Sequence, residues 1–310
     1  MQPPRVSIVL PTKDGAETLP GVLHAIWQQR FAGGLEVIGV DSGSTDGTVA
    51  ILKDRVDRFV AIPPAEFNHG LTRNLGVEVA TGELVVLLVQ DAEPQSEHWL
   101  TALTAPLYAD LTVAGAFARQ VPRAEAGDLT RAWHRRRVAA SSDPFVSDPM
   151  TEAEFAGLTP AGRHQRCVFD NVCSCIRRSV WKRHPFAETP MAEDLEWAKD
   201  VLLSGHRIVF APDAVVAHSH DRSVRYEFQR TRELHERLRA LFDLQTIPGL
   251  PHLARAILTS AARHGWAELA TPERLPRALG LAVAWPLGQY LGARRGSVEQ
   301  PAPAGLGISG

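Results

Sequence analysis

Two parts of the sequence carry groups that suit metal binding. Asp91 follows residues 84–89, a nearly pure aliphatic run, and a lone carboxylate at such a position is costly without a cation or hydrogen-bond donors. A hard divalent cation is the expected partner of this carboxylate. His218 and His220 follow another apolar run, and side-chain alternation along a strand predicts that the two imidazoles point to opposite sides. We therefore expect one of these histidines, but not both, to reach the metal.

An acidic pair, Glu193 and Asp194, stands where a helical pattern begins. Either carboxylate can cap the helix N-terminus, and either can point into a cleft and remove a proton from a reacting hydroxyl. The sequence identifies both residues as candidates for a general base and does not choose between them.

Residues 66–74 combine an amide, an imidazole and a guanidinium group around Gly70, just before a predicted helix. Arginine offers phosphate oxygens a fixed donor geometry, and a helix N-terminus favours an anion. Asn68, His69 and Arg73 are therefore candidates for binding a diphosphate. The alternative is a polar helix cap in which His69 is only hydrogen bonded.

Two aspartates lie between a predicted strand and a predicted helix. Asp41 ends the strand, where its carboxylate can accept hydrogen bonds from a ribose or a base. Asp46 lies at the start of the helix, and we expect it to cap the helix N-terminus.

Short apolar runs alternate with helical patterns over the first half of the chain, which predicts an α/β domain with largely parallel strands and crossover helices. Residues 84–89 are expected to form the central strand, because a run without polar residues suits a strand buried on both faces. Ligands bind beyond the carboxyl ends of the strands in such sheets, so the site is expected there. The expected strands are residues 6–10, 35–40, 59–62, 84–89, 172–176, 207–210 and 215–217.

In the rest of the chain we expect a long loop, three short strands, several helices and a terminal tail. Residues 141–166 contain two Asp-Pro pairs and no clear period, which predicts a long loop. Residues 296–310 are rich in Gly and Pro and are expected to be disordered. We expect a catalytic domain over residues 1–245 and a helical extension over residues 246–295. The expected helices are residues 19–27, 45–52, 71–80, 195–203, 226–244, 253–266 and 275–291.

The helical extension offers a candidate membrane surface. Its apolar residues recur at helical spacing beside Arg255 and Arg263, and a more apolar stretch ends in Arg294 and Arg295. Such helices are too interrupted to span a bilayer, but they can lie in its interface, with arginines meeting anionic headgroups. The alternative is a pair of helices that pack on the catalytic domain.

Composition limits the function classes. The chain has 310 residues, of which 45% are hydrophobic and 22% charged, so it can bury an ordinary globular core. Its formal charge of -2 gives no global positive field, and we expect no nucleic-acid partner. The three cysteines, Cys167, Cys173 and Cys175, suit neither a disulfide framework nor a zinc site, and the N-terminus has no secretory pattern, so a cytoplasmic location is expected.

As an ordered set, these segments resemble the inverting family 2 glycosyltransferases of the GT-A fold, whose mixed, mostly parallel sheet is flanked by helices. The general resemblance rests on residues 6–12, residues 41–47, the strand ending in Asp91 and the pair 193–194. A narrower resemblance to bacterial rhamnosyltransferases of cell-surface glycans rests on residues 67–70, 73–74, 90–92, 169–171 and 218–220.

The resemblance implies a role for each matching residue. The residues of the nucleotide-sugar site are then Pro11, Thr12, Asp14, Asp41, Asn68, His69, Arg73 and Gln90. Asp91 matches the last acid of the D-x-D metal motif and His218 the histidine beside the metal, which is Mg or Mn. Asp194 matches the catalytic base, with Glu193 beside it as the alternative. One departure is that Val89 occupies the position of the first acid, so nucleotide phosphates would complete the metal ligands.

The resulting prediction is an inverting transferase that uses a nucleotide-diphosphate sugar, dTDP-L-rhamnose, and a saccharide or lipid-linked glycan acceptor. It would act in the cytoplasm or at the inner face of the cell membrane. One alternative is the same fold with a UDP-hexose donor, and another is a nucleotide-sugar binding protein that has lost catalysis. A dinucleotide oxidoreductase is disfavoured, because no Gly-rich turn follows residues 6–10.

Overall fold

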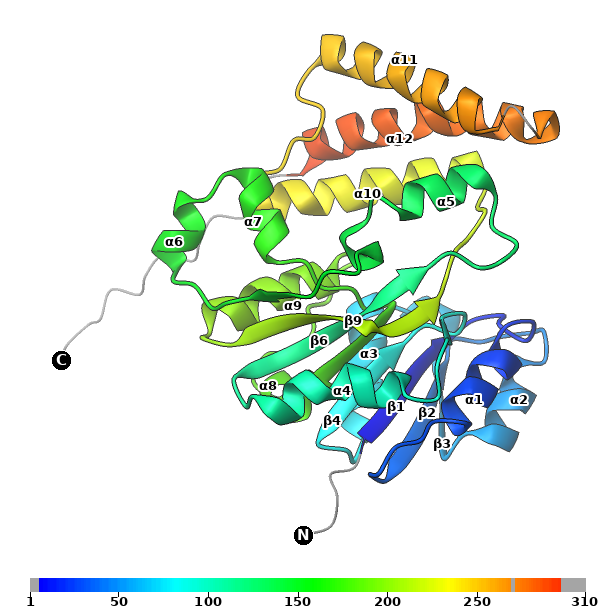
Figure 1. Cartoon of the computed structure of the whole chain (residues 1–310), viewed down its shortest axis with the longest axis vertical. Coiled ribbons are helices and arrows are strands. Elements are labelled where there is room, and N and C mark those ends of the chain that lie inside the picture. Colours follow the sequence, from blue (N-terminus) through cyan, green and yellow to red (C-terminus); the bar gives the residue numbers. More distant parts are fainter. Residues whose placement is uncertain (1–5, 269–270, 297–310) are drawn as a thin grey trace.

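A mixed β-sheet forms the centre of the protein in a computed structural model, which describes residues 6–268 and 271–296 (Figure 1). The sheet has nine strands in the described residues, in the order β3-β2-β1-β4-β8-β6-β9-β5, and β7 pairs with β9. The strands are β1 (Val6–Thr12), β2 (Leu35–Asp41), β3 (Arg58–Ala61), β4 (Leu84–Leu88), β5 (Glu93–Pro94), β6 (Val113–Val121), β7 (Phe145–Ser147), β8 (Cys173–Arg177) and β9 (Arg207–Ala217).

The N-terminal half has the predicted alternation of strands and helices. β1, β2, β3 and β4 are parallel, and every residue of β4 is buried, as expected for a central strand. Crossover helices cover both faces, and the two large apolar clusters of the core lie between these helices and the sheet. The helices of this half are α1 (Leu19–Trp27), α2 (Thr48–Arg55), the short η1 (Pro64–Glu66), α3 (His69–Val79) and α4 (Trp99–Ala109).

The sheet continues beyond β4 with antiparallel strands. β8 pairs antiparallel with both β4 and β6, whereas β6 and β9 are parallel. Residues 207–210 and 215–217, expected as separate strands, form one strand, because a register shift opposite Ala118 and Arg119 accommodates the intervening residues. No element was expected in residues 95–140, where β6 is built largely of small residues and gives a weak β signal.

The predicted loop over residues 141–166 is wrong. After η2 (Val138–Ala140), this segment contains β7 and two short helices, α6 (Glu152–Gly157) and α7 (Pro160–Arg166). Thr151 and Glu154 form a capping box for α6, and Thr159 caps α7 at Gly162 N. Helices this short show too few turns for a period to be recognised, so only their caps could have revealed them.

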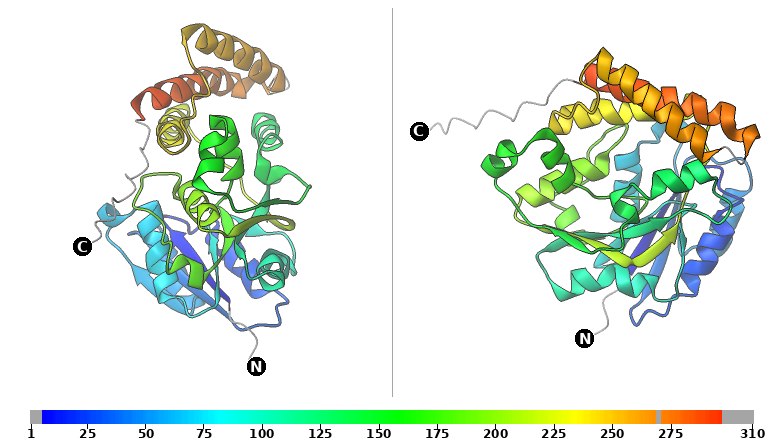
Figure 2. Two further views of the ribbon diagram at one scale, coloured as in Figure 1. Left: turned by 90° about the vertical axis from the view of Figure 1, so that its left-hand side faces the viewer. Right: turned by 45° about the horizontal axis from the view of Figure 1, so that its top comes forward.

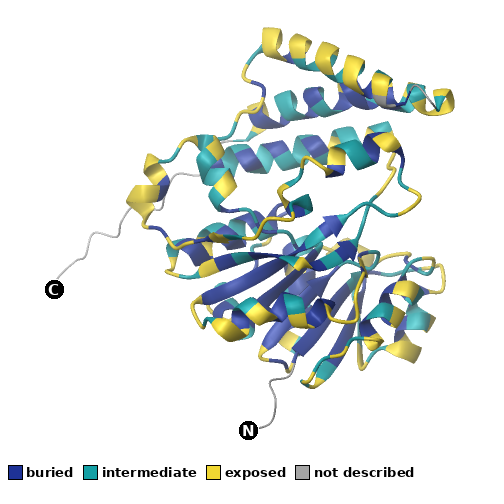
Figure 3. Cartoon of the chain, viewed as in Figure 1, coloured by how far each residue is buried: buried dark blue, intermediate teal, exposed yellow. Residues whose placement is uncertain are grey.

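A helical layer stands over one end of the sheet (Figure 2), formed by α5 (Asp128–His134), α10 (Val224–Phe242), α11 (Leu250–Ala267) and α12 (Leu275–Arg295). The backbones of α10 and α12 approach so closely at Gly292 that a side-chain carbon there would overlap the carbonyl oxygen of Arg232. The outer face of α11 is exposed (Figure 3), and none of the described helices is long and apolar enough to cross a membrane. The remaining helices are α8 (Arg178–Trp181), α9 (Glu193–Leu203) and η3 (Pro272–Arg274). Disorder was predicted for residues 296–310, of which residues 297–310 lie outside the described part of the chain.

Candidate active site

One carboxylate and two imidazoles meet at the end of the sheet. The Nε2 atom of His220 lies 3.0 Å from Asp91 Oδ2, and the Nε2 atom of His218 lies 3.6 Å from Asp91 Oδ1. The two Nε2 atoms are 3.1 Å apart. These ligand atoms are close enough to bind one cation, and a mixed oxygen and nitrogen set suits a divalent metal.

The expectation that alternation sends the two imidazoles to opposite sides is wrong, because β9 ends at Ala217. Beyond that residue the two rings meet edge to face with centroids 4.7 Å apart. The two-residue strand β5 then brings Asp91 to them, since Glu93 pairs antiparallel with Ala217. Non-local pairing, not strand periodicity, therefore builds the cluster.

The protonation states of this cluster favour ligation. Burial lowers the pKa of His218 to about 3, against the opposing charge of Asp91, so its ring is neutral at pH 7. Burial raises the pKa of Asp91, but the hydrogen bond with His220 and the charges of the two histidines and Arg123 bring it below its usual value. A neutral imidazole and an ionised carboxylate are the forms that bind metals.

The two acids at the start of α9 have different environments. Glu193 is 5% exposed, and its carboxylate pairs with Arg73 Nη1 at 2.9 Å and accepts a hydrogen bond from Asn171 Nδ2 at 3.2 Å. Asp194 has no cation partner among the described residues, and its Oδ2 accepts from the backbone N–H of Asn171 at 3.2 Å. Ala192, which precedes them, has a left-handed backbone with φ of 63°.

The environment of Asp194 suits a base. Burial, together with the negative charges of Glu193 and Asp170, raises its pKa to about 8. A carboxylate with so high a pKa binds a proton tightly, as a general base near neutral pH must. Glu193 is held by Arg73 instead, so the geometry favours Asp194 among the two candidates.

Asp170 links the acidic pair to the metal-binding cluster. Its Oδ2 accepts from Arg137 Nη2 at 2.8 Å and from Gln120 Nε2 at 2.7 Å. After the larger effect of burial on each group, the charge of Asp170 raises the pKa of both Asp194 and His218, so Asp170 lies near both groups.

The expected nucleoside-binding residues form a closed hydrogen-bonded loop. The Asp41 carboxylate is 1% exposed and accepts from Thr12 Oγ1 at 3.0 Å and from the backbone N–H groups of Gly43 and Ser44 at 2.9 and 2.8 Å. Asp14, in a left-handed conformation with φ of 45°, accepts from Thr45 N at 2.8 Å. These carboxylates fix the shape of the loop, and the buried Asp41 carboxylate is occupied by groups of the protein itself.

Gln90 fastens this loop to the end of β4. Its Oε1 accepts from Lys13 N at 2.8 Å, and its Nε2 donates to Lys13 O at 2.9 Å. A side-chain carbon at Gly15 would overlap the Gln90 amide, so the amide can keep this position only with glycine at residue 15. Pro11, the penultimate residue of β1, precedes the same loop. Asp46 accepts from the backbone N–H of Thr48, the first residue of α2, at 3.1 Å, but Gly47 and not Asp46 occupies the N-cap position.

The structure separates the three candidate diphosphate ligands. Asn68 caps α3, because its Oδ1 accepts from the backbone N–H groups of Gly70 and Leu71 at 3.0 and 3.1 Å. His69 stands edge to face on Phe67, and burial lowers its pKa. Arg73 turns inward to Glu193. The polar-cap alternative therefore describes Asn68, and Arg73 belongs to the acidic pair.

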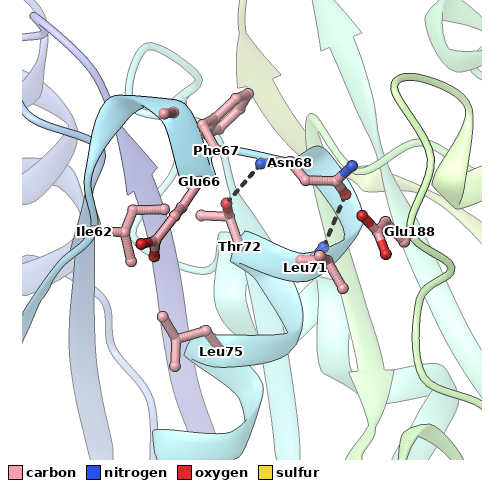
Figure 4. A pocket seen from close by; sticks show the side chains of 9 residues that line it. Ile62, Glu66, Phe67, Asn68, Leu71, Thr72, Leu75 and Glu188 are labelled. Atoms are coloured by element: carbon pink, nitrogen blue, oxygen red, sulfur yellow. Dashed lines mark hydrogen bonds between the residues drawn. The ribbon is translucent and has the colours of Figure 1, made fainter.

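A cavity of about 440 Å³ adjoins Asn68 (Figure 4). The carboxylates of Glu66 and Glu188 stand on two sides of it, and Ile62, Leu71 and Leu75 form its apolar wall. Two carboxylates without a facing cation repel phosphate, so this cavity does not suit a diphosphate.

Several site residues were missed by the sequence analysis. His220 was discounted through alternation, whereas Arg137 and Gln120 lie in residues 95–140, where no element was expected. The segment 169–171 contributed to the resemblance, yet no role was assigned to Asn171, which contacts both acids.

Comparisons with known proteins agree with this geometry. The family model of "Glycosyl transferase family 2" matches residues 7–167. The chain is 32% identical over 231 residues to the O-antigen chain rhamnosyltransferase RfbN of Salmonella typhimurium (strain LT2). This alignment covers 73% of this chain and 70% of the relative. The chain is 30% identical, with the same coverage, to the O-antigen chain rhamnosyltransferase WbaN of Salmonella anatum.

Solved structures show the same fold. The mannosyltransferase PcManGT from Pyrobaculum calidifontis, in complex with GDP-Man and Mn2+, aligns with a TM-score of 0.62 at 22% identity, over 95% of this chain and 88% of that one. Glucosyl-3-phosphoglycerate synthase from Mycobacterium tuberculosis, in complex with UDP, aligns with a TM-score of 0.53 at 17% identity, over 80% and 83%. The fold is GT-A, as predicted, and the chain belongs to glycosyltransferase family 2.

Proposed function

We propose that this family 2 glycosyltransferase transfers L-rhamnose from dTDP-L-rhamnose to a hydroxyl of a saccharide or lipid-linked glycan, with inversion, in cell-surface polysaccharide synthesis. The observation that carries the proposal is a half-buried Asp194 carboxylate with a pKa of about 8 and no cation partner among the described residues, together with the Asp-His-His cluster. The choice of rhamnose is supported by the relatives, two of which are named as rhamnosyltransferases.

In this mechanism Asp194 accepts the proton of the acceptor hydroxyl while the oxygen attacks the anomeric carbon from the face opposite the nucleotide. Arg73 pairs with Glu193 beside it, and after burial the negative charge of Glu193 is the next cause of the high pKa of Asp194. Asp91, His218 and His220 would hold a divalent cation, whose charge stabilises the departing diphosphate when it is bound.

The ligand set favours manganese over magnesium. Magnesium binds oxygen ligands almost exclusively, whereas imidazole nitrogen suits transition metals. Two of the three ligands here are imidazoles. We therefore expect Mn2+ to support turnover at lower concentration than Mg2+.

The experiment that tests the function is a nucleotide-release assay with matched donors. The full chain is mixed with Mn2+, a saccharide acceptor and either dTDP-L-rhamnose or UDP-glucose, and free dTDP or UDP is measured. Faster release from dTDP-L-rhamnose, with an inverted linkage by NMR, supports the proposal. Preference for UDP-glucose selects the hexose alternative, and donor binding without release or transfer selects the catalytically inactive protein.

The helical extension is proposed to rest on an anionic membrane at the inner face of the cell membrane, which would bring the site to a lipid-linked acceptor. On α11, Leu258 and Trp266 are 71% and 76% exposed, and Arg255 is exposed on the same helix. Burial of such side chains in the interface, with arginines near anionic headgroups, favours attachment. The three buried free cysteines suit a reducing compartment.

Liposome co-sedimentation of the full chain tests this attachment. Leu258→Asp should reduce pelleting with anionic vesicles at low salt. Leu111→Asp is the matched control, because Leu111 is 75% exposed but lies in the loop between α4 and β6. Equal pelleting of both variants and the wild type, or no pelleting of the wild type, would contradict the proposal.

A further inference from the structure

A second cavity, also of about 440 Å³, lies in the helical layer. Its walls come from α5, α10, α11 and α12, which Figure 1 shows grouped over one end of the sheet. The residues that matter for its chemistry are Trp133, Arg136, Arg230, Arg263, His264 and Trp285.

An aromatic surface forms one side of this cavity. The rings of Trp133 and Trp285 are stacked, with centroids 6.3 Å apart and an interplanar angle of 25°. His264 stands edge to face on Trp285 at 5.2 Å. Trp133 is 37% exposed, although a solvent-facing indole leaves a large apolar surface in water. Aromatic faces of this kind pack against the apolar faces of sugar rings.

Three guanidinium groups border the same cavity without protein partners. Among the described residues, the side chains of Arg136, Arg230 and Arg263 make no hydrogen bond and no ion pair. The one carboxylate of the lining, Glu227, accepts from Trp285 Nε1 at 3.1 Å. The lining therefore has an excess of positive charge and donors whose geometry matches phosphate oxygens.

A chain of contacts leads from the cavity to Asp194. The Arg137 guanidinium lies over the Trp133 ring, 4.9 Å from its centroid, and the same group binds Asp170. Asn171, the residue after Asp170, donates its backbone N–H to Asp194 Oδ2 at 3.2 Å. On the other side, the charge of Arg230 lowers the pKa of His69, after the larger effect of burial.

From this arrangement we propose that the cavity is an acceptor subsite that binds the phosphate-bearing end of a glycan, with the guanidinium groups on the phosphate and the tryptophans on a sugar ring. The inference rests on the proposed glycosyl transfer, because a transferase needs an acceptor site beside its base. It adds the chemical class of the acceptor: a saccharide esterified through phosphate or diphosphate.

Calorimetric titration of the full chain in EDTA tests the subsite without turnover. The probes are inorganic pyrophosphate, inorganic phosphate and glucose 1-phosphate, and EDTA prevents their binding through a metal. Arg263→Gln should weaken pyrophosphate and glucose 1-phosphate by about tenfold, the effect of losing a hydrogen bond to a charged group. Arg255→Gln is the matched control, because Arg255 is an exposed arginine of α11 that does not line the cavity.

Trp133→Ala distinguishes the contribution of the sugar ring to binding from the contribution of the phosphate. It should weaken glucose 1-phosphate and leave pyrophosphate unchanged, and an unchanged melting temperature would show that the variant is folded. Absence of binding to the wild type, equal losses in the Arg263 and Arg255 variants, or equal affinity for phosphate and glucose 1-phosphate would overturn the proposal. Because binding is measured without a donor, such a failure is distinct from absence of nucleotide release, which would overturn the proposed transfer itself.

A lipid carrier is distinguished by one further titration, with geranyl diphosphate in place of pyrophosphate. Tighter binding of geranyl diphosphate, weakened by Arg263→Gln, would support a lipid diphosphate as the source of the phosphate. Binding equal to that of pyrophosphate, with glucose 1-phosphate still preferred to phosphate, would support a soluble glycan phosphate within the same subsite.

Discussion

The two sides of the catalytic edge differ in how their polar groups are satisfied. On the side proposed to bind the nucleoside, Asp41 accepts four hydrogen bonds from its own loop and β1, and both polar atoms of the Gln90 amide bind Lys13. On the reaction side, Asp194 has no cation partner among the described residues, and the buried Nδ1 of His218 has no hydrogen-bond partner.

This difference separates groups that shape a site from groups that react in it. A fully bonded carboxylate is stabilised in one position, and its removal weakens the loop it holds. An incompletely bonded, desolvated group has a shifted pKa and a free lone pair, which are the properties of a base or a metal ligand. We therefore expect substitutions on the reaction side to reduce turnover and those on the nucleoside side to reduce donor affinity and stability.

The largest effect is expected for Asp194→Asn. Turnover should fall by about 10³-fold or more, because the base is lost, while donor affinity stays close to that of the wild type. Steady-state and donor-binding measurements on the same preparation check this. If Glu193→Gln is inactive and Asp194→Asn is active, the role of general base has been assigned to the wrong residue.

Unfolding measurements supply the control for this variant. The pKa of Asp194 in the folded protein, about 8, exceeds its value in the unfolded chain, so the folded protein binds one more proton between these values. The free energy of unfolding contributed by this group therefore falls as pH rises through that window. Asp194→Asn should remove this dependence and be at least as stable as the wild type at pH 9.

Asp91→Asn should have the second-largest effect. We expect a loss of about 10²-fold or more in metal-dependent turnover, because the only carboxylate of the metal-binding cluster loses its charge at constant volume. Activity is measured against Mn2+ concentration, with the wild type in excess EDTA as the reference. Undiminished wild-type activity in EDTA would contradict the metal role.

Glu193→Gln should change the pH profile more than the maximal rate. In the wild type, turnover should rise with pH through about 8, since Asp194 must be deprotonated to accept a proton. Removing the negative charge of Glu193 lowers the pKa of Asp194, so the rising limb should move to lower pH. An unchanged profile would show that Glu193 does not influence the base. Arg73→Lys, which keeps the positive charge opposite Glu193, serves as the comparison.

Gln90→Leu should have the smallest effect. Losing the two hydrogen bonds to Lys13 should cost about 1 kcal/mol of stability, because both lie in an exposed setting, and should raise the KM for the donor severalfold. The pH at which turnover rises should not change. A shifted profile would remove the distinction between the two sides, since Gln90 would then act on the base.

Much of the fold could be predicted because its signals are local. The β4 run and the helical periods of α1, α9 and α10 follow from residues a few positions apart, and strand ends meet at one edge of a parallel sheet. The resemblance likewise depended on short ordered motifs. By contrast, α6 and α7 have capping residues but no recognisable helical period in the sequence. The small residues of β6 form a strand through pairing with β8 and β9, which the local sequence does not indicate.

The sequence by itself determined the fold class, the placement of Asp91 at a strand end and the acidic pair at the start of α9. Only the tertiary structure decided that His220 joins the metal-binding cluster, through the pairing of β5 with β9. It also decided that Arg73 and Asn171 hold Glu193 and leave Asp194 free of a cation. The physical reason is that desolvation and charge pairing depend on groups brought together from distant segments. The sequence of one segment does not indicate which residues of other segments will pack against it.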